Sequence, residues 1–166
     1  WGLNLYQSPA GYTQALDPYN DPRPLFISEF GQDVWNSSSN AVDAASQASF
    51  YQSRWTGSIG PRLSAINGAQ KLVGACAFEW NDEWYKDPAG AWGSHDNGGF
   101  ALSNDNDNYS NEEWFGLTAA LATGVNGPRS TRSAYSILQS LWTAAPYNSA
   151  VPASCCPSCS ATMRSY

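Results

Sequence analysis

The stretch that decides the fold is Pro24-Leu25-Phe26-Ile27-Ser28-Glu29-Phe30-Gly31. Its consecutive apolar residues place hydrophobic side chains on both faces of the predicted strand, which is typical of a parallel strand covered on both sides. The run ends in a carboxylate, and Gly31 then allows the backbone to turn away. Because functional side chains of parallel α/β proteins lie at the carboxyl ends of strands, Glu29 is predicted to be catalytic.

A second run, Leu72-Val73-Gly74-Ala75-Cys76-Ala77-Phe78-Glu79-Trp80, repeats this design. The flat face of a pyranose stacks on an indole, and a carboxylate can attack or stabilise an oxocarbenium-like centre. Trp80 is therefore predicted to form the floor of a sugar subsite. Glu79 is predicted to face the helix layer and pair with a lysine or arginine, and Cys76 to be a buried free thiol.

The remaining chain predicts a strand–helix alternation. A helix is expected from Asp43, which can cap its first turn, to about Ile59, where apolar residues recur at three- and four-residue steps. The other predicted segments are strands over 1–6, 24–30 and 72–80, a proline-containing loop over 7–23, a short helical or turn segment over 62–70, an irregular loop over 81–116, and a final helix over about 131–144.

The order of three segments resembles the last three strands of a retaining β-glycoside hydrolase barrel. They are Trp1-Gly2-Leu3-Asn4-Leu5-Tyr6, then Pro24 to Gly31, then Phe78-Glu79-Trp80-Asn81-Asp82-Glu83-Trp84-Tyr85-Lys86. The later segment Asn111-Glu112-Glu113-Trp114-Phe115-Gly116 also recurs in such sequences. The resemblance is to the catalytic barrel of glycoside hydrolase family 2 and to β-1,3-glucanosyltransferases. It covers roughly residues 1–144, and the Ser-Glu-Phe-Gly segment is its most specific part.

The resemblance implies an α/β fold over residues 1–145, namely about the last three βα units of a TIM (β/α)8 barrel. In that family the glutamate that ends strand seven is the nucleophile, which falls on Glu29, and the aromatic residue that ends strand eight floors the subsite, which falls on Trp80. We also expect substrate contacts from residues at the strand mouths, namely Asn4, Tyr6, Asp82, Glu83 and Trp84. The expected partner is a polysaccharide or oligosaccharide, and neither a metal nor a cofactor is required.

The chain departs from the family in length, because a complete barrel has eight strands and about 250 residues, whereas this sequence has 166 residues and shows three such strands. The family's acid/base glutamate follows an asparagine at the end of strand four, and Asn111-Glu112 lies too late in the chain to fill that role. The missing part of the barrel is expected on the same gene product or on another chain. The alternative is a non-catalytic extracellular structural glycoprotein, a wall, sheath or filament subunit, that forms a homo-oligomer.

Composition narrows the partners and the compartment. A net charge of −6 with eight basic residues argues against nucleic acid and anionic membranes, and no apolar run approaches the roughly 18 residues of a membrane span. Residues 146–166 form a Pro/Ser-rich tail in which Cys155, Cys156 and Cys159 predict a disulfide-bearing extension. Glycosylation sequons at Asn36 and Asn108 agree with it, and together they predict a secreted or cell-surface protein.

Overall fold

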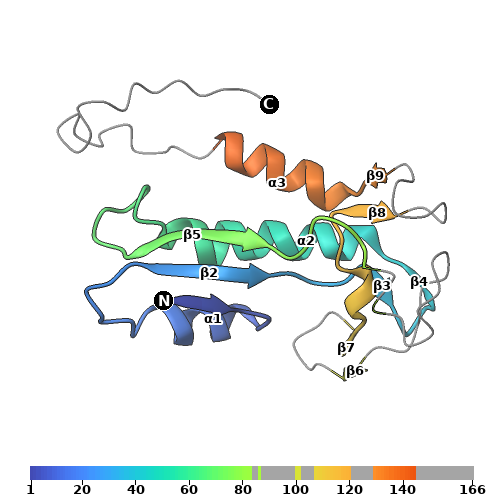
Figure 1. The fold of residues 1–166 in the computed structure, drawn as a ribbon, viewed down its shortest axis with the longest axis horizontal. Helices are drawn as coiled ribbons and strands as arrows, with labels where there is room; N and C mark the ends of the chain where they lie inside the picture. The colour runs from blue at the N-terminus through green and yellow to red at the C-terminus, as the bar shows by residue number, and fades with distance from the viewer. Residues whose placement is uncertain (84–85, 87–99, 102–106, 121–128, 145–166) are drawn as a thin grey trace.

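The computed structural model describes residues 1–83, 86, 100–101, 107–120 and 129–144. At its centre is a parallel sheet in the order β1-β2-β5, formed by β1 (Gly2–Asn4), β2 (Leu25–Phe30) and β5 (Leu72–Ala77). The α-helices of this part are α1 (Pro9–Leu16), α2 (Ala44–Arg54) and α3 (Ser133–Ala144) (Figure 1). The chain therefore has a mixed α/β fold, as predicted, and the described residues do not close a barrel.

Shorter elements surround this unit. The antiparallel pairs are β3 (Trp35–Asn36) with β4 (Ala41–Val42), β6 (Phe100–Ala101) with β7 (Tyr109–Ser110), and β8 (Thr118–Ala120) with β9 (Arg129–Thr131). A π-helical turn η1 (Trp55–Ile59) continues α2 and is followed by the 3-10 turn η2 (Gly60–Arg62), and a further 3-10 turn η4 (Glu112–Trp114) precedes β8.

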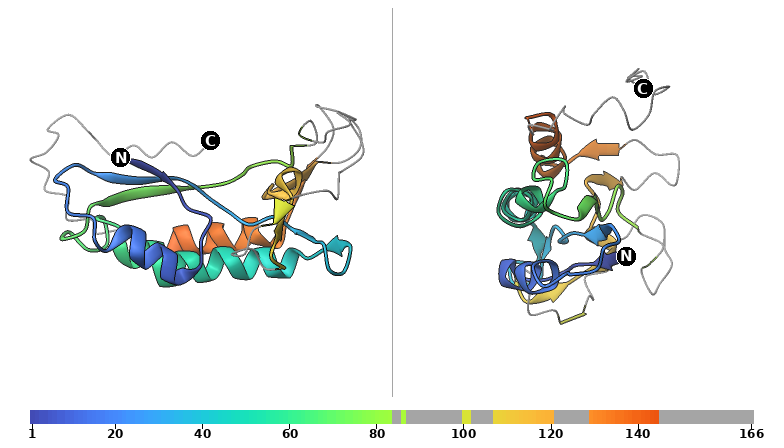
Figure 2. Two further views of the ribbon diagram at one scale, coloured as in Figure 1. Left: turned by 90° about the horizontal axis from the view of Figure 1, so that it is seen from below. Right: turned by 90° about the vertical axis from the view of Figure 1, so that its left-hand side faces the viewer.

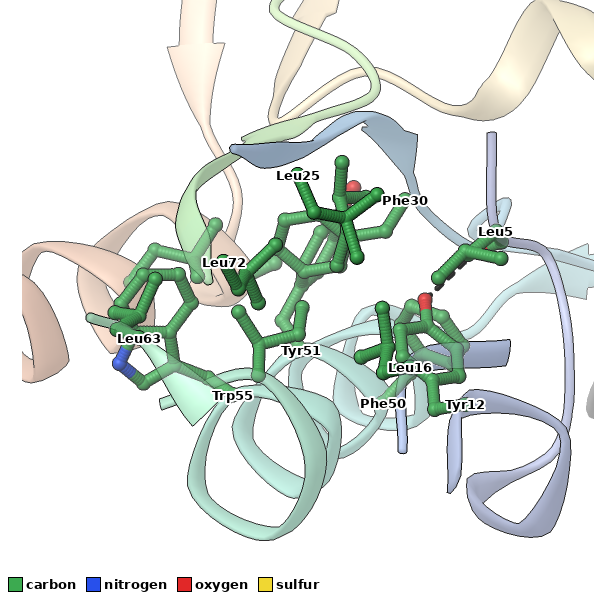
Figure 3. Close-up of a cluster of buried hydrophobic side chains, with 14 of the residues drawn as sticks. Leu5, Tyr12, Leu16, Leu25, Phe30, Phe50, Tyr51, Trp55, Leu63 and Leu72 are labelled. Atoms are coloured by element: carbon green, nitrogen blue, oxygen red, sulfur yellow. Dashed lines mark hydrogen bonds between the residues drawn. The ribbon is translucent and has the colours of Figure 1, made fainter. Parts of the chain in front are cut away.

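All three helices lie on the same face of the parallel sheet, as the left-hand view of Figure 2 shows. The side chains of Leu25, Ile27 and Phe30 on β2 point toward these helices and are almost fully buried. They pack with Tyr12 of α1 and Tyr51 of α2 in one hydrophobic cluster, part of which is drawn in Figure 3. Burial of this face is the main source of apolar stabilisation in the described part.

The described helices do not cover the opposite face of the sheet. Phe26 and Ser28 alternate with the buried residues of β2 and are half-buried, whereas Asn4 of β1 is exposed. Gly74 of β5 lies against the ring of Phe26, and a Cβ at Gly74 would be 3.2 Å from that ring. The prediction that the second strand is covered on both faces is therefore not met by the described residues, which cover one face.

In the described part of the chain, no strand pairs with the edge of β5 that faces away from β2. A parallel bridge joins Leu63 to Leu72 at its start, and another joins Asn81 to Thr118 beyond its end. Because the sheet order is β1-β2-β5, both β1 and β5 are edge strands there. In the described part of the chain, the sheet thus has one face that no helix covers and two edges to which further strands can be added.

The predicted loop over 7–23 is wrong, because α1 lies within it. The Oγ atom of Ser8 accepts a hydrogen bond from the N–H of Gly11 at 3.3 Å and caps the helix. Pro9 occupies the first helical position, where its missing N–H is not needed. The loop was predicted from Pro9, Pro18 and Pro22. Proline is, however, compatible with the first position of a helix, which Pro9 occupies.

The predicted helix from Asp43 to Ile59 is confirmed by α2 and η1, and the final helix is confirmed by α3. Two boundaries differ from the prediction, because β1 covers residues 2–4 and β5 ends at Ala77. The stretch 81–116 is not wholly irregular, since β7 and η4 lie in it. No helix among the described residues has both the length and the apolar character needed to cross a bilayer.

Replacement of Asp43 by alanine is expected to lower the free energy of unfolding by about 1 kcal/mol. The carboxylate of Asp43 accepts a hydrogen bond from the N–H of Ser46 at 2.9 Å, and alanine leaves this N–H without its cap. Denaturant unfolding of the purified protein measures the change. Asp43→Asn is the matched control, because asparagine caps helices nearly as well, and equal losses in both variants would contradict a capping role.

Candidate active site at the carboxyl ends of the strands

Glu29 lies at the carboxyl end of the central strand and is hydrogen-bonded to Tyr6. The phenolic O–H of Tyr6 donates to Oε2 of Glu29 at 2.7 Å. Tyr6 follows β1, which runs parallel to β2, and the N–H of Leu5 donates to the carbonyl of Glu29 at 2.8 Å. Because parallel strands end at the same edge of a sheet, β1 and β2 bring these two predicted site residues together.

Asn4, also predicted as a site residue, lies beside this pair on the open face. It is paired in register with Glu29, and its Oδ1 accepts a hydrogen bond from Ser28 Oγ at 2.7 Å. The bond is exposed. Asn4 and Ser28 therefore present an amide and a hydroxyl at an exposed position on the strands that carry Tyr6 and Glu29. Both groups can form hydrogen bonds to a polar ligand.

Two phenylalanines complete the surroundings of Tyr6. The ring of Tyr6 lies edge-on to Phe78 at 6.1 Å and to Phe115 at 5.8 Å between centroids, and the two phenylalanines are 5.6 Å apart. Burial, followed by the hydrogen bond to Glu29, raises the pKa of Tyr6 above its ordinary value. Tyr6 therefore stays protonated and remains the donor. Asn4, Tyr6, Glu29, Phe78 and Phe115 are called the Glu29 site below.

Close backbone packing holds Phe78 and Phe115 in place. A Cβ at Gly31 would lie 2.0 Å from the carbonyl oxygen of Phe78, so only glycine fits there. The hydroxyl of Tyr51 donates to the same carbonyl at 2.7 Å. The buried side chain of Gln47 donates through Nε2 to the carbonyl of Phe115 at 3.3 Å. Tyr51 and Gln47 both belong to α2, so this helix positions the site as well as the core.

Glu79 follows Phe78 in the chain, and Lys86, which pairs with Glu83, lies over the ring of Phe78. The Nζ of Lys86 is 2.5 Å from Glu83 Oε2, 2.8 Å from Glu112 Oε1 and 5.4 Å from the ring centroid of Phe78. Burial, and then the charge of Glu83 and its hydrogen bond, raise the pKa of Glu79 to about 9. Among the described residues, no ion pair joins Glu79 to a lysine or arginine, so the predicted pairing is not seen there. Glu83, a predicted substrate contact, lies in the same group.

Asp82 is part of a buried ion pair. Its Oδ1 and Oδ2 lie 2.5 Å and 2.6 Å from NH1 and NH2 of Arg132, and Oδ1 also accepts from the N–H of Gly116 at 3.1 Å. The side chain of Asp82 is 0% exposed. A carboxylate in this position joins the segment after β5 to the start of α3. Its burial does not suit the predicted contact with sugar hydroxyls.

Trp80 makes its ring contact with α3. The indole is 59% exposed and lies edge-on to Tyr135 at 5.7 Å. It lines a mainly apolar cavity of about 390 Å³ together with Ala77, Leu138 and Trp142. Its surroundings are therefore different from those of Glu29, which is hydrogen-bonded on the β1 side. The predicted role as a subsite floor stays a prediction, and Trp84 lies outside the described residues.

The secreted or cell-surface location was predicted from the glycosylation sequons and the cysteines, and only some of these residues lie in the described part of the chain. Asn36 is half-buried and accepts a hydrogen bond from the N–H of Ser39 at 2.9 Å, whereas Asn108 is exposed with a φ of 63°. Cys76 is exposed, so the prediction of a buried thiol is wrong. The tail over 146–166, with Cys155, Cys156 and Cys159, lies outside the described residues.

Sequence reasoning did not identify Phe78 and Phe115 as members of the site. Both residues belong to quoted segments, Phe78 in the second apolar run and Phe115 in the Asn111–Gly116 segment. No local pattern shows that two segments more than 30 residues apart meet at Tyr6. The position of Phe78 directly before Glu79, at the end of the second predicted strand, is the signal in the sequence that could have identified Phe78.

The arrangement defines a class of site: a carboxylate at the carboxyl mouth of a parallel sheet, oriented by a tyrosine and bordered by aromatic rings. Comparison with known proteins does not assign the chain to a family. No family model, no curated protein and no solved structure matches the chain.

Replacement of Asp82 by alanine is expected to lower the free energy of unfolding by about 3–5 kcal/mol, because it leaves the buried guanidinium of Arg132 without a counter-charge. Denaturant unfolding measures the loss. Asp17→Ala is the matched control, since it breaks the Asp17–Arg62 pair, in which Asp17 is exposed, and should change stability far less. Similar losses in the two variants would contradict a structural role for the buried pair.

Proposed function

We propose that this chain is the C-terminal part of a secreted retaining glycoside hydrolase or transglycosylase that acts on a β-linked polysaccharide, with Glu29 as the nucleophile. The observation that carries the proposal is the 2.7 Å hydrogen bond from Tyr6 to Glu29 at the carboxyl mouth of the sheet. A nucleophilic carboxylate needs one oxygen directed at the anomeric carbon, and a donor on the other oxygen fixes that orientation.

The arrangement of helices supports a barrel. Doubly wound sheets carry helices on both faces, whereas in a (β/α)8 barrel every helix lies on the outside. Here α1, α2 and α3 share one face. The other face has Gly2 and Gly74 beside Ser28 and Phe26, so it leaves room for side chains from further strands. In the proposed barrel, strands from the same gene product or another chain continue from the edges of β1 and β5.

The proposed reaction has two steps and needs two carboxyl groups. Glu29 attacks the anomeric carbon and forms a glycosyl-enzyme bond, while a carboxylic acid of the missing barrel part protonates the leaving oxygen. The same group then takes a proton from water or from an acceptor sugar, which attacks the anomeric carbon and releases Glu29. The acid would lie about 5–5.5 Å from Glu29, the spacing of retaining enzymes. This chemistry requires no metal or cofactor.

The neighbouring groups suit a saccharide ligand. Asn4 and Ser28 offer an exposed amide and an exposed hydroxyl on the strands that carry Tyr6 and Glu29, and sugar hydroxyls form hydrogen bonds with both groups. Phe78 and Phe115 contact the ring of Tyr6, and a hydrogen bond is stronger in such apolar surroundings than in water. The exposed indole of Trp80 offers a stacking surface at the next strand end. The two sequons favour a secreted or cell-surface location for such an enzyme.

Turnover by the intact protein on β-linked glucan oligosaccharides is expected to disappear in Glu29→Gln, which keeps the shape of the side chain but removes the nucleophile. Substrate binding should remain. Full activity of this variant would exclude Glu29 as nucleophile. Binding without turnover in the unmodified protein would instead favour the structural glycoprotein.

Tyr6→Phe is expected to lower kcat roughly 10–100-fold, which corresponds to a hydrogen bond to a charged group of about 1.5–3 kcal/mol. KM should change less, because the lost bond orients Glu29 and does not bind the sugar. Tyr19→Phe is the matched control, since the hydroxyl of Tyr19 donates to the carbonyl of Arg23 at an exposed position. Steady-state kinetics on the three proteins measure the effect, and equal kcat in all of them would contradict the role of Tyr6.

A further inference from the structure

The two glycosylation sequons meet around one carboxylate, that of Asp107. The main-chain N–H of Ser37 donates to Oδ2 of Asp107 at 2.5 Å, and the N–H of Tyr109 donates to Oδ1 at 3.0 Å. Ser37 and Tyr109 are the middle residues of the sequons that begin at Asn36 and Asn108. Two sequons that are far apart in the chain therefore lie in one region of the structure, and the structure treats their asparagines differently.

Asn108 lies at the tip of a turn. It is exposed and has a φ of 63°, in the left-handed region that asparagine tolerates better than most residues. The bond from the N–H of Tyr109 to the Asp107 carboxylate closes an Asx turn around it. The chain then enters β7, where Ser110 is paired with Phe100 and is 0% exposed. The residues on both sides of Asn108 are thus held, and Asn108 itself is in solvent.

The backbone around Asn36 is closed by hydrogen bonds. Asn36 is half-buried and lies in β3, where it is paired with Ala41 of β4. Its Oδ1 accepts a hydrogen bond from the N–H of Ser39 at 2.9 Å, and the N–H of the next residue is bonded to Asp107. An N-linked glycan is bulky and needs an exposed attachment point. A glycan on Asn36 would therefore compete with this turn, whereas one on Asn108 extends into solvent.

We propose that Asn108 carries an N-linked glycan and that the sequon at Asn36 stays unmodified in the folded protein. This modification depends on the secreted or cell-surface location proposed above, because the donor is a lipid-pyrophosphate-linked oligosaccharide of the secretory pathway. A bond forms between the amide nitrogen of Asn108 and C1 of the sugar, and the bond from C1 to the pyrophosphate oxygen breaks. The lipid pyrophosphate leaves, and the amide proton passes to a base of the transferase.

The glycan would mark a surface that stays in solvent in the complete protein. The pairs β3–β4 and β6–β7 lie beyond the end of the sheet toward which β2 and β5 run (Figure 1). A surface that carries a glycan cannot be packed against another part of the protein. The missing part of the proposed barrel is therefore expected at the edges of β1 and β5 and not over the turn that precedes β7.

Glycan mapping of the intact gene product, secreted from a eukaryotic host, is the direct test. Release of N-glycans by a peptide-N-glycosidase in 18O-labelled water converts each modified asparagine to a labelled aspartate, and peptide mass spectrometry locates the label. We expect the label at Asn108 and its absence at Asn36. An unlabelled Asn108, or a label at Asn36 in most molecules, would overturn the proposal without any need for a variant.

Three variants separate control by the fold from control by the local sequence. Asn108→Gln should abolish the mass lost on glycan release, and Asn36→Gln, its matched control, should leave that mass unchanged. Ser38→Thr changes an exposed residue and keeps the sequon at Asn36, with the hydroxyl that transferases accept more readily. Asn36 should stay unlabelled in this variant. A label there would show that the serine, and not the turn, had kept the sequon unmodified, and would contradict the second half of the proposal.

The glycan map does not use catalysis, so its outcome is separate from that of the proposed enzyme. A secreted protein that is glycosylated at Asn108 but does not turn over β-linked glucan oligosaccharides would contradict the enzyme and retain the glycan. A secreted and active protein without a glycan at Asn108 would do the reverse.

Discussion

The structure depends on the burial of one face of the central strand β2. Leu25, Ile27 and Phe30 lie under the helices, where their contacts with Tyr12 and Tyr51 hold α1 and α2 on the same side of the sheet. Because these side chains alternate with Phe26 and Ser28, the same packing directs the latter to the open face. Parallel pairing with β1 and β5 then places Glu29 at the end of the sheet where these strands also finish.

Three carboxyl groups near this end are treated in different ways by their surroundings. Asp82 is buried and charged, and the guanidinium of Arg132 with the N–H of Gly116 satisfies it. Glu79 is partly buried, and this burial together with the charge of Glu83 raises its pKa. Glu29 accepts one hydrogen bond from a protonated tyrosine and follows Ser28, whose hydroxyl bonds to Asn4 at an exposed position. The first environment suits a structural anion and the second a neutral acid, and the third belongs to the residue that we propose as the nucleophile.

Sequence patterns predicted the elements whose signals are local. The apolar run over 24–30 gave β2, and Asp43 with the following apolar periodicity gave α2. The first helix was not predicted, because Pro9 can mark either a loop or the first turn of a helix, and the helix is distinguished by the capping bond of Ser8. The juxtaposition of Glu29, Tyr6 and Asn4 was predictable, because parallel strands end together. The meeting of Phe78 with Phe115 and the pairing of Asp82 with Arg132 depend on long-range packing that no local pattern contains.

The central claim is that Glu29 forms a covalent bond to a sugar, and trapping of that intermediate tests it most directly. The intact protein would be incubated with an activated 2-deoxy-2-fluoro-β-glucoside, whose glycosyl-enzyme intermediate hydrolyses slowly, and digested for peptide mass spectrometry. The account predicts a fluoroglucosyl group on the peptide that contains Ser28-Glu29-Phe30, with fragment ions that place it on Glu29. A label on another carboxylate, or turnover of the substrate without any labelling of Glu29, would contradict the account.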